Sequence, residues 1–530
     1  MSENVKVARA AGVVGAATLA SRVMGYIRDM VMSWAFGTTA AADAFYVAYR
    51  IPNLLRELLA EGSMSAAFIP VFSETLAKET REDARRLANA VLARLLVILL
   101  IVTALGILFA PVIVKAIALG WKFKDDREKF LTAVTLTRVM FPYLLFIGMA
   151  ALAMGMLNSL RAFLTPALSP VMLNVMTISS VIFLAPRMPE PITGAAIGVV
   201  LGGLFQFLIQ VPALHRQGMM LRPRFTPSHP GVTKVGKLAL PVFFSSSVNQ
   251  INIFVSTILA SFLATGSITF LFYGMRFIHF PLGIFGIAIA TAVLPTLSTQ
   301  AARQEMGDFR ETLSLGIRLV FFIMFPAMAG LIMLRVPIVN LLLEHGEFNR
   351  ISTLGVSTAL LYYAVGLWAL AGVRIVSQAF YSLQDTKTPV RIAMLAVAVN
   401  ILLSVVLMQT TLQHGGLALA NSLAAALNIW LLTKRLRKKI GRMDGRRILR
   451  SLARIVPASA AMAVIGWWIA RDPMWDSPGN ILLKVQWLAG GMAASMLFYI
   501  AALWALGSEE LRFLWGAFRR QRRAREEGAA

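Results

Sequence analysis

Four arginines stand inside apolar stretches of this chain, where charged residues are otherwise rare: Arg22, Arg28, Arg56 and Arg276. An arginine at the centre of a membrane-spanning helix costs at least ~2.5 kcal/mol on insertion scales, so these side chains are expected to face a wet interior rather than lipid. The guanidinium group keeps its charge and presents a planar fork of donors that matches phosphate oxygens. The arginines therefore predict an anion site, and a pyrophosphate group is the ligand that fits it best.

Two aspartates accompany these arginines. Asp29 follows Arg22 by seven residues and shares its helical face, and Asp43 opens the next apolar stretch. We include both in the predicted substrate site, as partners that orient the arginines. In the alternative interpretation, Arg22 pairs with Asp29, Arg56 pairs with Asp43 or Glu61, and the charges only lock helices together.

The composition predicts the class of protein. The chain has 530 residues, of which 58% are hydrophobic and 15% charged, with a mean hydropathy of +0.70, whereas about a quarter of a soluble domain is charged. We expect a polytopic membrane protein whose first apolar run is a retained helix. Cysteine is absent, which excludes disulfides and thiolate metal sites.

No cofactor or metal is predicted. The sequence has no glycine-rich loop ending in Gly-Lys-Ser/Thr, so ATP is not the expected energy source. The segment Glu344-His345-Gly346-Glu347 resembles part of a metal cluster, but it lacks a second histidine at ligand spacing. We interpret it as a solvated loop.

Apolar runs long enough to cross a ~30 Å hydrocarbon core as helices recur along the whole chain. They lie near residues 9–35, 43–72, 88–119, 133–157, 163–185, 193–214, 238–264, 268–297, 312–335, 353–382, 388–410, 415–434, 450–470 and 481–506. The predicted fold class is thus an all-α polytopic membrane protein with fourteen transmembrane helices. Kinks are expected at Pro52, Pro281 and Pro295.

The net charge of +25 is concentrated between the apolar runs. Lysine and arginine gather in the breaks after even-numbered helices, most densely at 434–447, whereas the breaks 37–42, 265–267 and 409–414 have none. The break 121–130 is an exception, because its basic and acidic residues nearly balance. Since basic loops stay in the cytoplasm, both termini are predicted to be cytoplasmic.

The basic run 434–447 has two interpretations. It reports topology and contact with anionic membrane lipids in the favoured one, and a site for a partner protein or nucleic acid in the other. No nucleic-acid partner is predicted.

The two halves of the chain contain matching motifs. Asn158-Ser159-Leu160 with Thr165-Pro166 matches Tyr381-Ser382-Leu383 with Thr388-Pro389 at an offset of 223 residues. Such an offset covers six helices, an even number, so the two copies cross the membrane in the same direction. This parallel repeat is typical of transporters, with the substrate site between the halves. We predict two six-helix lobes, 1–220 and 221–440, and a segment 441–530 with two extra C-terminal helices and a basic tail.

Several motifs together resemble a known family. They are Ser21 to Asp29, Ala42 to Phe45, Pro52 to Arg56, Ala60 to Gly62, Arg276 with Phe280 to Gly286, and Asp385 to Pro389. These motifs resemble the MurJ (MviN) lipid II flippases of the multidrug/oligosaccharidyl-lipid/polysaccharide exporter superfamily, over essentially the whole chain. The resemblance implies a bacterial inner-membrane transporter, not an enzyme, that moves lipid II to the periplasmic leaflet for peptidoglycan synthesis. Lipid II is the undecaprenyl-pyrophosphate-linked disaccharide-pentapeptide.

The resemblance also implies roles for parts of the chain. In this family a central cationic cavity binds the pyrophosphate and sugar head, and the last two helices form a groove for the lipid tail. The charged residues important in the family match Arg22, Arg28, Asp43, Arg56 and Arg276. Some members bind sodium through an acid in the seventh helix, but this chain has no carboxylate there, so no sodium site is expected. Cell-wall synthesis proteins are further candidate partners.

Other functions remain open at this point. A related exporter of another polyprenyl-linked saccharide would use a similar cavity. A drug/cation antiporter would be expected to keep a membrane-buried carboxylate as its coupling site, whereas this chain buries mainly arginines. A scaffold that binds lipids or enzymes through basic loops would need no arginines inside its spanning helices.

Overall fold

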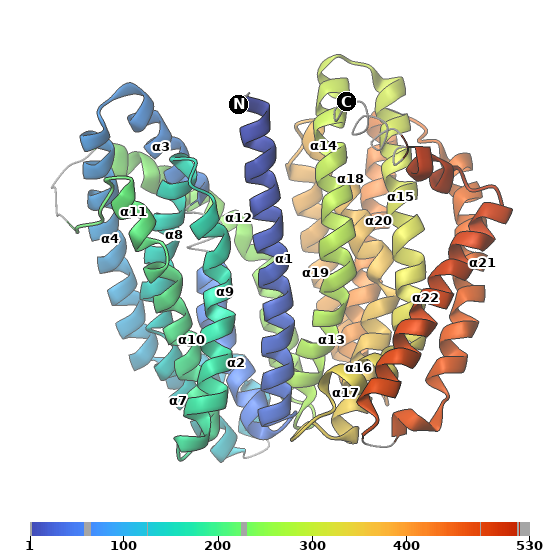
Figure 1. The fold of residues 1–530 in the computed structure, drawn as a ribbon, viewed down its shortest axis with the longest axis horizontal. Helices are drawn as coiled ribbons and strands as arrows, with labels where there is room; N and C mark the ends of the chain where they lie inside the picture. The colour runs from blue at the N-terminus through green and yellow to red at the C-terminus, as the bar shows by residue number, and fades with distance from the viewer. Residues whose placement is uncertain are drawn as a thin grey trace. The chain divides into compact units, whose positions relative to one another are not determined.

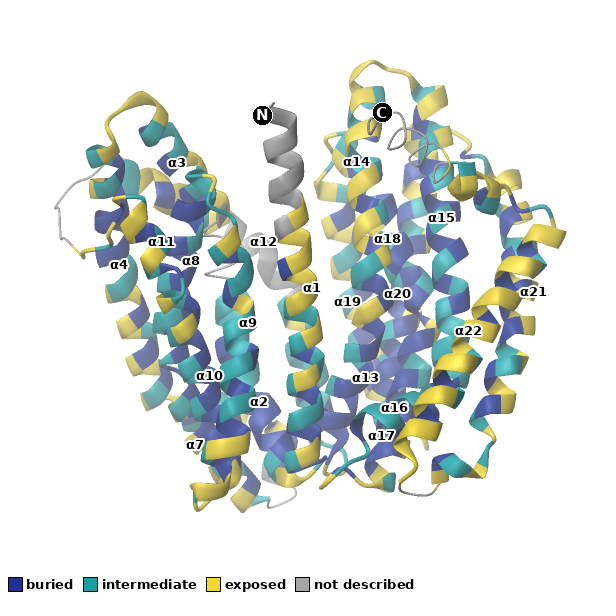
Figure 2. Ribbon diagram, in the orientation of Figure 1, coloured by how far each residue is buried: buried dark blue, intermediate teal, exposed yellow. Residues whose placement is uncertain are grey.

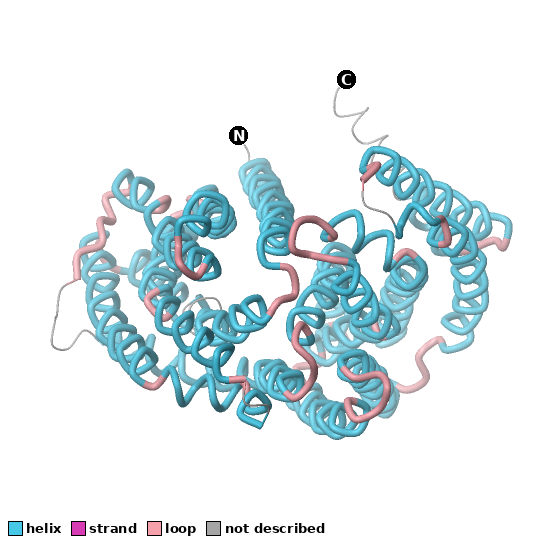
Figure 3. Tube along the Cα trace, turned by 90° about the horizontal axis from the view of Figure 1, so that it is seen from below, coloured by secondary structure: helices cyan, strands magenta, loops and turns pink. Residues whose placement is uncertain are grey.

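The computed structural model describes residues 3–57, 65–123, 126–223, 230–476, 479–516 and 519. Every regular element in these ranges is a helix, and no strand occurs among them (Figure 1, Figure 3). The prediction of an all-helical protein is therefore confirmed for the described residues.

The chain forms two compact units. The first contains residues 1–268 and the short segment His345–Phe348, and the second contains 269–344 and 349–530. Helix α12 belongs to the first unit because it packs against α3, α4, α5 and α6. The predicted boundaries at 220 and 440 divide the chain by its sequence repeat, whereas these units are defined by their internal packing. The repeat boundaries stay a prediction.

The first unit consists of twelve helices in the described residues. They are α1 (Glu3–Phe36), α2 (Ala40–Arg56), α3 (Ser65–Lys78), α4 (Arg81–Leu108), α5 (Ala110–Ile117), α6 (Leu119–Phe123), α7 (Arg127–Met140), α8 (Tyr143–Ser159), α9 (Leu164–Ser179), α10 (Pro191–Leu208), α11 (Val211–Arg216) and α12 (Pro230–Ser261). A π-helical turn at Ser180–Leu184 and a 3-10 turn at Ala185–Arg187 follow α9.

The second unit begins within α13. Its helices are α13 (Ser267–Pro281), α14 (Ile287–Ala302), α15 (Met306–Met333), α16 (Arg335–Leu343), α17 (Arg350–Val365), α18 (Leu367–Ser382), α19 (Lys387–Leu407), α20 (His414–Ile440), α21 (Gly445–Ala470) and α22 (Ile481–Ala505). The irregularity expected near Pro281 takes the form of a π-helical turn at Leu282–Gly286.

Most of the predicted spans coincide with long apolar helices. Among the described residues, ten helical segments are long and apolar enough to cross a membrane, and α17 with α18, bent by 42°, would make an eleventh. The remaining predicted runs, 9–35, 43–72 and 238–264, fall on α1, on α2 with α3, and on α12, which include or adjoin residues that are not described. The total of fourteen therefore stays a prediction.

Local sequence signals fix several helix starts. Thr39 is the N-cap of α2, with extended backbone angles (φ −71°, ψ 172°), and its hydroxyl accepts a hydrogen bond from the Ala42 amide. Thr80 and Asp83 form a capping box at the start of α4. These caps satisfy amide groups that the first turn of a helix leaves unpaired.

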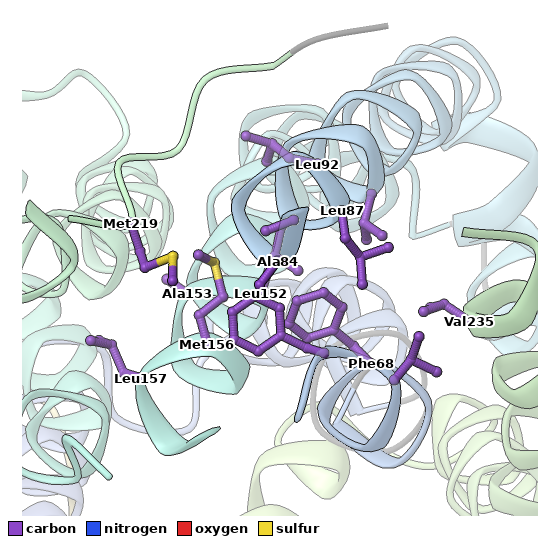
Figure 4. Packing of buried hydrophobic residues seen from close by; sticks show 14 of the residues in the cluster. Phe68, Ala84, Leu87, Leu92, Leu152, Ala153, Met156, Leu157, Met219 and Val235 are labelled. Carbon is purple, nitrogen blue, oxygen red and sulfur yellow. The ribbon is translucent and has the colours of Figure 1, made fainter. Parts of the chain in front are cut away.

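An apolar core joins α3, α4 and α8 of the first unit (Figure 4). Phe68 of α3, Leu87 of α4 and Met156 of α8 are fully buried in it. Small residues allow close helix contacts nearby, because a Cβ atom on Gly203 of α10 would lie 2.6 Å from the ring of Tyr143. This packing fixes the start of α8, and with it the Tyr143 side chain.

Three of the loops that follow odd-numbered predicted helices lie together at one end of the first unit. Lys129 forms an ion pair with Asp43, and the amide of Gly266 donates to the same carboxylate. These contacts join the breaks 37–42, 121–130 and 265–267, which the loop charges predict to share one side of the membrane. The basic breaks meet elsewhere in the unit, where Lys234 forms an ion pair with Glu74. The side of the membrane on which each loop lies, and the cytoplasmic placement of the termini, stay predictions.

In the second unit, polar contacts attach the last two helices. Arg318 of α15 is buried and forms ion pairs with Glu510 at 2.8 Å and with Glu509 at 3.0 Å, just beyond α22. The Tyr499 hydroxyl donates to the Phe322 carbonyl at 2.7 Å. Figure 2 shows many exposed residues along α21 and α22. The hairpin α21–α22 is therefore fixed by its polar contacts and presents much apolar surface outward.

Candidate functional site

Helix α1 carries the first group of predicted site residues. The Asn174 side-chain amide of α9 donates to the Ser21 carbonyl at 3.2 Å, which fixes α1 beside α9 at the level of Arg22. The Arg22 side chain is half-buried, and no hydrogen bond or ion pair joins it to any described residue.

Arg28 and Asp29 pair with each other. The guanidinium Nη2 and Nε of Arg28 donate to Asp29 Oδ1 at 2.7 and 3.1 Å. Asp29 is 2% exposed. The alternative pair of Asp29 with Arg22 is thus replaced by a contact between sequence neighbours. The predicted role of Asp29 as an orienting partner of the site arginines stays a prediction.

The end of α2 presents Arg56. Its Nε donates to Asn53 Oδ1 at 3.2 Å, and its Nη2 lies 3.8 Å from Glu57 Oε1. The Arg56 side chain is 20% exposed. Its predicted alternative partner Glu61 lies outside the described residues.

The structure brings Arg28 and Arg56 into one neighbourhood. The buried Tyr143 hydroxyl of α8 interacts electrostatically with both guanidinium groups and with Tyr49 of α2. No hydrogen-bond partner of this hydroxyl occurs among the described residues. The Tyr143 hydroxyl is thus within electrostatic range of both guanidinium groups.

Helix geometry gives the positions of the three arginines of the first unit along α1 and α2. Phe36 and Thr39 are joined by a hydrogen bond, so α1 ends where α2 begins. At ~1.5 Å per helical residue, Arg28 lies ~12 Å and Arg22 ~21 Å before Phe36, and Arg56 lies ~20 Å after Asp43. Each of these lengths is shorter than the ~30 Å thickness of a hydrocarbon core, so the predicted location of the arginines inside the membrane stays a prediction.

The Asp43 carboxylate is buried in an ion pair rather than exposed on a surface. Its Oδ2 accepts from Lys129 Nζ at 3.0 Å and from the Gly266 amide at 2.8 Å, and its side chain is 1% exposed. Lys129 also lies over the Trp121 ring and reaches Thr265 at 3.4 Å. This arrangement connects α2, α7 and the segment before α13. Asp43 thus joins helices through an ion pair, as in the alternative interpretation, but its cation is Lys129 and not Arg56.

Arg276 belongs to the second unit and is described apart from the other arginines. It lies half-buried on α13, two residues after Gly274. A Cβ atom on Gly274 would lie 2.9 Å from Ala359 Cβ, so α13 and α17 pack closely at this level. His279, one turn later, is exposed.

Sequence reasoning missed two residues of this site. Lys129 was assigned to a loop with balanced charges, and Glu57 was not singled out. A signal for Glu57 was present, because residues 53, 56 and 57 share a helical face. No comparable signal marks Lys129.

Hydrogen bonds hold both ends of the segment Glu344 to Glu347. Glu344 accepts a hydrogen bond from Thr353, and the Glu347 amide donates to the Trp34 carbonyl at 2.9 Å. Gly37 has a positive φ of 54°, and a Cβ atom there would lie 2.3 Å from the Glu347 carbonyl oxygen. Among the described residues, no group of three side chains is arranged to hold a metal ion.

Comparison with known proteins decides the family. The sequence profile described as "Lipid II flippase MurJ" matches residues 32–477. The chain belongs to the MurJ lipid II flippase family. The resemblance seen in the motifs is thereby confirmed.

Full-length relatives support this assignment. A probable lipid II flippase MurJ of Vibrio cholerae is 39% identical over 93% of this chain and 95% of its own length. The lipid II flippase MurJ of Burkholderia cenocepacia is 34% identical over 97% of this chain and 99% of its own. Because MurJ relatives are named as flippases, the family consists of transporters, and this chain is a multi-pass inner-membrane protein rather than an enzyme.

Solved structures agree with the family. A lipid II flippase MurJ in an inward closed conformation has a TM-score of 0.76 at 26% identity, over 93% of this chain and 99% of that chain. A multidrug resistance transporter of the MATE family in an inward-facing conformation has a TM-score of 0.65 at 16% identity, over 79% of this chain and 94% of that chain. The second likeness concerns the fold alone.

Proposed function

We propose that this protein moves lipid II from the cytoplasmic to the periplasmic leaflet of the bacterial inner membrane. The observation that carries the proposal is the full-length match to relatives named as lipid II flippases. The arginines that we predict to lie inside the membrane give it a physical basis, since lipid II carries a pyrophosphate between its lipid and its sugar. A guanidinium fork can bind two phosphate oxygens at once.

The substrate site proposed here contains Arg22, Arg28 and Arg56 of the first unit and Arg276 of the second. Asp29 pairs with Arg28, and Asp43 fixes the start of α2, the helix whose last residue is Arg56. The apolar outer surface of α21 and α22 is the proposed groove for the lipid tail. Anionic lipids are proposed to contact the basic residues at the end of α20 and the start of α21, and cell-wall synthesis proteins are the other candidate partners.

Alternating access is the proposed mechanism. Solved transporters with this fold include one in an inward-facing and one in an outward-facing conformation, with TM-scores of 0.65 and 0.56. In such a cycle the headgroup enters from the cytoplasmic side, binds the arginines and is released on the other side as the cavity reopens.

The decisive experiment measures headgroup exposure directly. In cells depleted of other flippases, expression of this protein should expose lipid II to an impermeant headgroup probe at the outer leaflet. Exposure of a different polyprenyl-linked saccharide, with none of lipid II, would assign the protein to a related exporter instead.

The same assay tests the phosphate-binding role of the arginines. Replacing Arg28, Arg56 and Arg276 together by lysine keeps every charge but removes the bidentate forks, so flipping should fall at least tenfold at unchanged membrane abundance. Full activity of this triple variant would contradict a pyrophosphate site.

A further inference from the structure

An acid stands beside one arginine of the proposed anion site. Glu57 directly follows Arg56, and its Oε1 lies 3.8 Å from Arg56 Nη2. The two side chains are 20% and 37% exposed, so water screens neither charge completely. A carboxylate at this place repels an anionic headgroup. A site selected only for tight binding would not carry it.

Neutral donors hold both oxygens of this carboxylate. Asn53 donates its Nδ2 to Glu57 Oε1 at 3.2 Å and accepts from Arg56 Nε at 3.2 Å. From α12, the Gln250 side chain donates its Nε2 to Glu57 Oε2. The Asn53 amide therefore bridges the acid and the arginine, and Gln250 holds the acid toward α12.

The distance between the two charges has a consequence. A direct charge-assisted bond between a guanidinium and a carboxylate is about 2.7 to 2.9 Å long, whereas Arg56 and Glu57 remain 3.8 Å apart. The carboxylate is thus close enough to act on the arginine through its charge, but it is restrained from closing on it. Asn53 binds the oxygen nearer to Arg56, and Gln250 binds the other oxygen from a different helix.

We propose that Glu57 is an internal counter-ion that competes with the phosphate of the substrate for Arg56, and that Gln250 limits this competition. The proposal rests on the proposed function, because it takes Arg56 as a phosphate-binding residue. A bound phosphate draws Arg56 away from Glu57, and the carboxylate reclaims the guanidinium as the headgroup leaves. Because a transporter must release what it binds, the acid accelerates release at the expense of affinity.

Two single substitutions should act in opposite directions. Glu57→Gln keeps the shape and a hydrogen-bond acceptor but removes the charge, so the Kd for lipid II should fall about tenfold, with kcat and KM for flipping both reduced. Gln250→Leu frees the carboxylate to close on Arg56, so the Kd should rise about threefold. Glu79→Gln changes an exposed acid after α3 and serves as the matched control. General loss of structure cannot tighten binding.

The measurement uses the full-length protein in lipid nanodiscs, titrated with lipid II, and in proteoliposomes for flipping. In an Arg56→Ala background the effect of Glu57→Gln on the Kd should vanish, because the acid acts through that arginine. Weaker binding by Glu57→Gln, or equal tightening in both backgrounds, would overturn the counter-ion proposal. If the unmodified protein binds no lipid II, the proposed function fails. If it binds and Glu57→Gln behaves like the control, only the counter-ion proposal fails.

Discussion

Replacing Lys129 by methionine would leave Asp43 buried without its cation. The Nζ and Oδ2 atoms are 3.0 Å apart, and the side chains are 2% and 1% exposed. At an effective dielectric constant of about 20, the attraction across that distance is about 5 kcal/mol. For the intact pair, the cost of desolvating both charges offsets much of this attraction. Removing one partner leaves the other charge buried, and no attraction then offsets its desolvation cost. We therefore expect a loss of about 3 to 5 kcal/mol in the free energy of unfolding.

This loss should be visible in thermal unfolding. For a unit of this size it corresponds to a fall in Tm of roughly 10 °C, measured by tryptophan fluorescence of the purified protein in detergent. Lys115→Met removes an exposed lysine of α5 as the control, and its effect on the unfolding free energy should stay within about 0.5 kcal/mol.

A double variant separates the ion pair from other causes. Asp43→Asn with Lys129→Met removes both charges and keeps an oxygen that can accept from the Gly266 amide, so most of the lost stability should return. A Tm of Lys129→Met within about 2 °C of the unmodified protein would refute the reasoning. So would a double variant no more stable than Lys129→Met alone.

Three further predictions concern topology, energy and pH. Single cysteines placed in this cysteine-free chain should be labelled from outside by an impermeant thiol reagent at the exposed positions Ala40, Ala264 and Thr411, whereas labelling there only after lysis would reverse the topology. Because the substrate head is anionic and an inside-negative potential is worth ~2.3 kcal/mol per charge per 100 mV, dissipating the potential with a potassium ionophore at constant pH and sodium should stop flipping. Sodium removal alone should not stop it, and the reverse pattern would indicate a sodium-coupled cycle. The Lys439 ammonium and the Thr388 bonds, acting against burial, hold the pKa of Asp385 well below its usual range. The stability that this depressed pKa provides is present above the ordinary aspartate pKa and lost as pH falls through the depressed one. The Tm of Asp385→Asn should therefore lie below that of the unmodified protein at pH 7 and approach it in acid, and a constant gap would contradict this origin.

Sequence reasoning recovered the helices because the membrane imposes them. A spanning segment needs about 20 apolar residues and must satisfy its own backbone, and both requirements are visible in hydropathy and loop charge. The irregularity after Pro281, a π-helical turn, was also visible, because proline removes a backbone donor. The bend between α17 and α18 carried no such mark, since the residue at the break is Gly366 and the apolar run continues through it.

The pairing of charges could not be read in the same way. Helical periodicity assigns a face to each Cβ atom, but the long Arg28 side chain reaches sideways to Asp29. Lys129 meets Asp43 across 86 residues, and Gln250 meets Glu57 across 193. Such contacts depend on how helices are packed rather than on local spacing. The sequence therefore singled out Arg28, Asp29, Asp43 and Arg56, but not the partners Lys129, Glu57 and Gln250.

The attachment of Arg318 has a consequence for how the protein is made. Its partner Glu510 follows 192 residues later, after the last long helix. At roughly 5 to 20 residues per second, the ribosome takes about 10 to 40 s to reach that point. During this interval the nascent α15 holds an arginine with neither acid available, so water, lipid headgroups or the insertion machinery must shelter it. Assembly of the second unit is thus completed only after Glu510 has been synthesised, and a chain cut short before Glu509 would expose an unneutralised arginine to quality control.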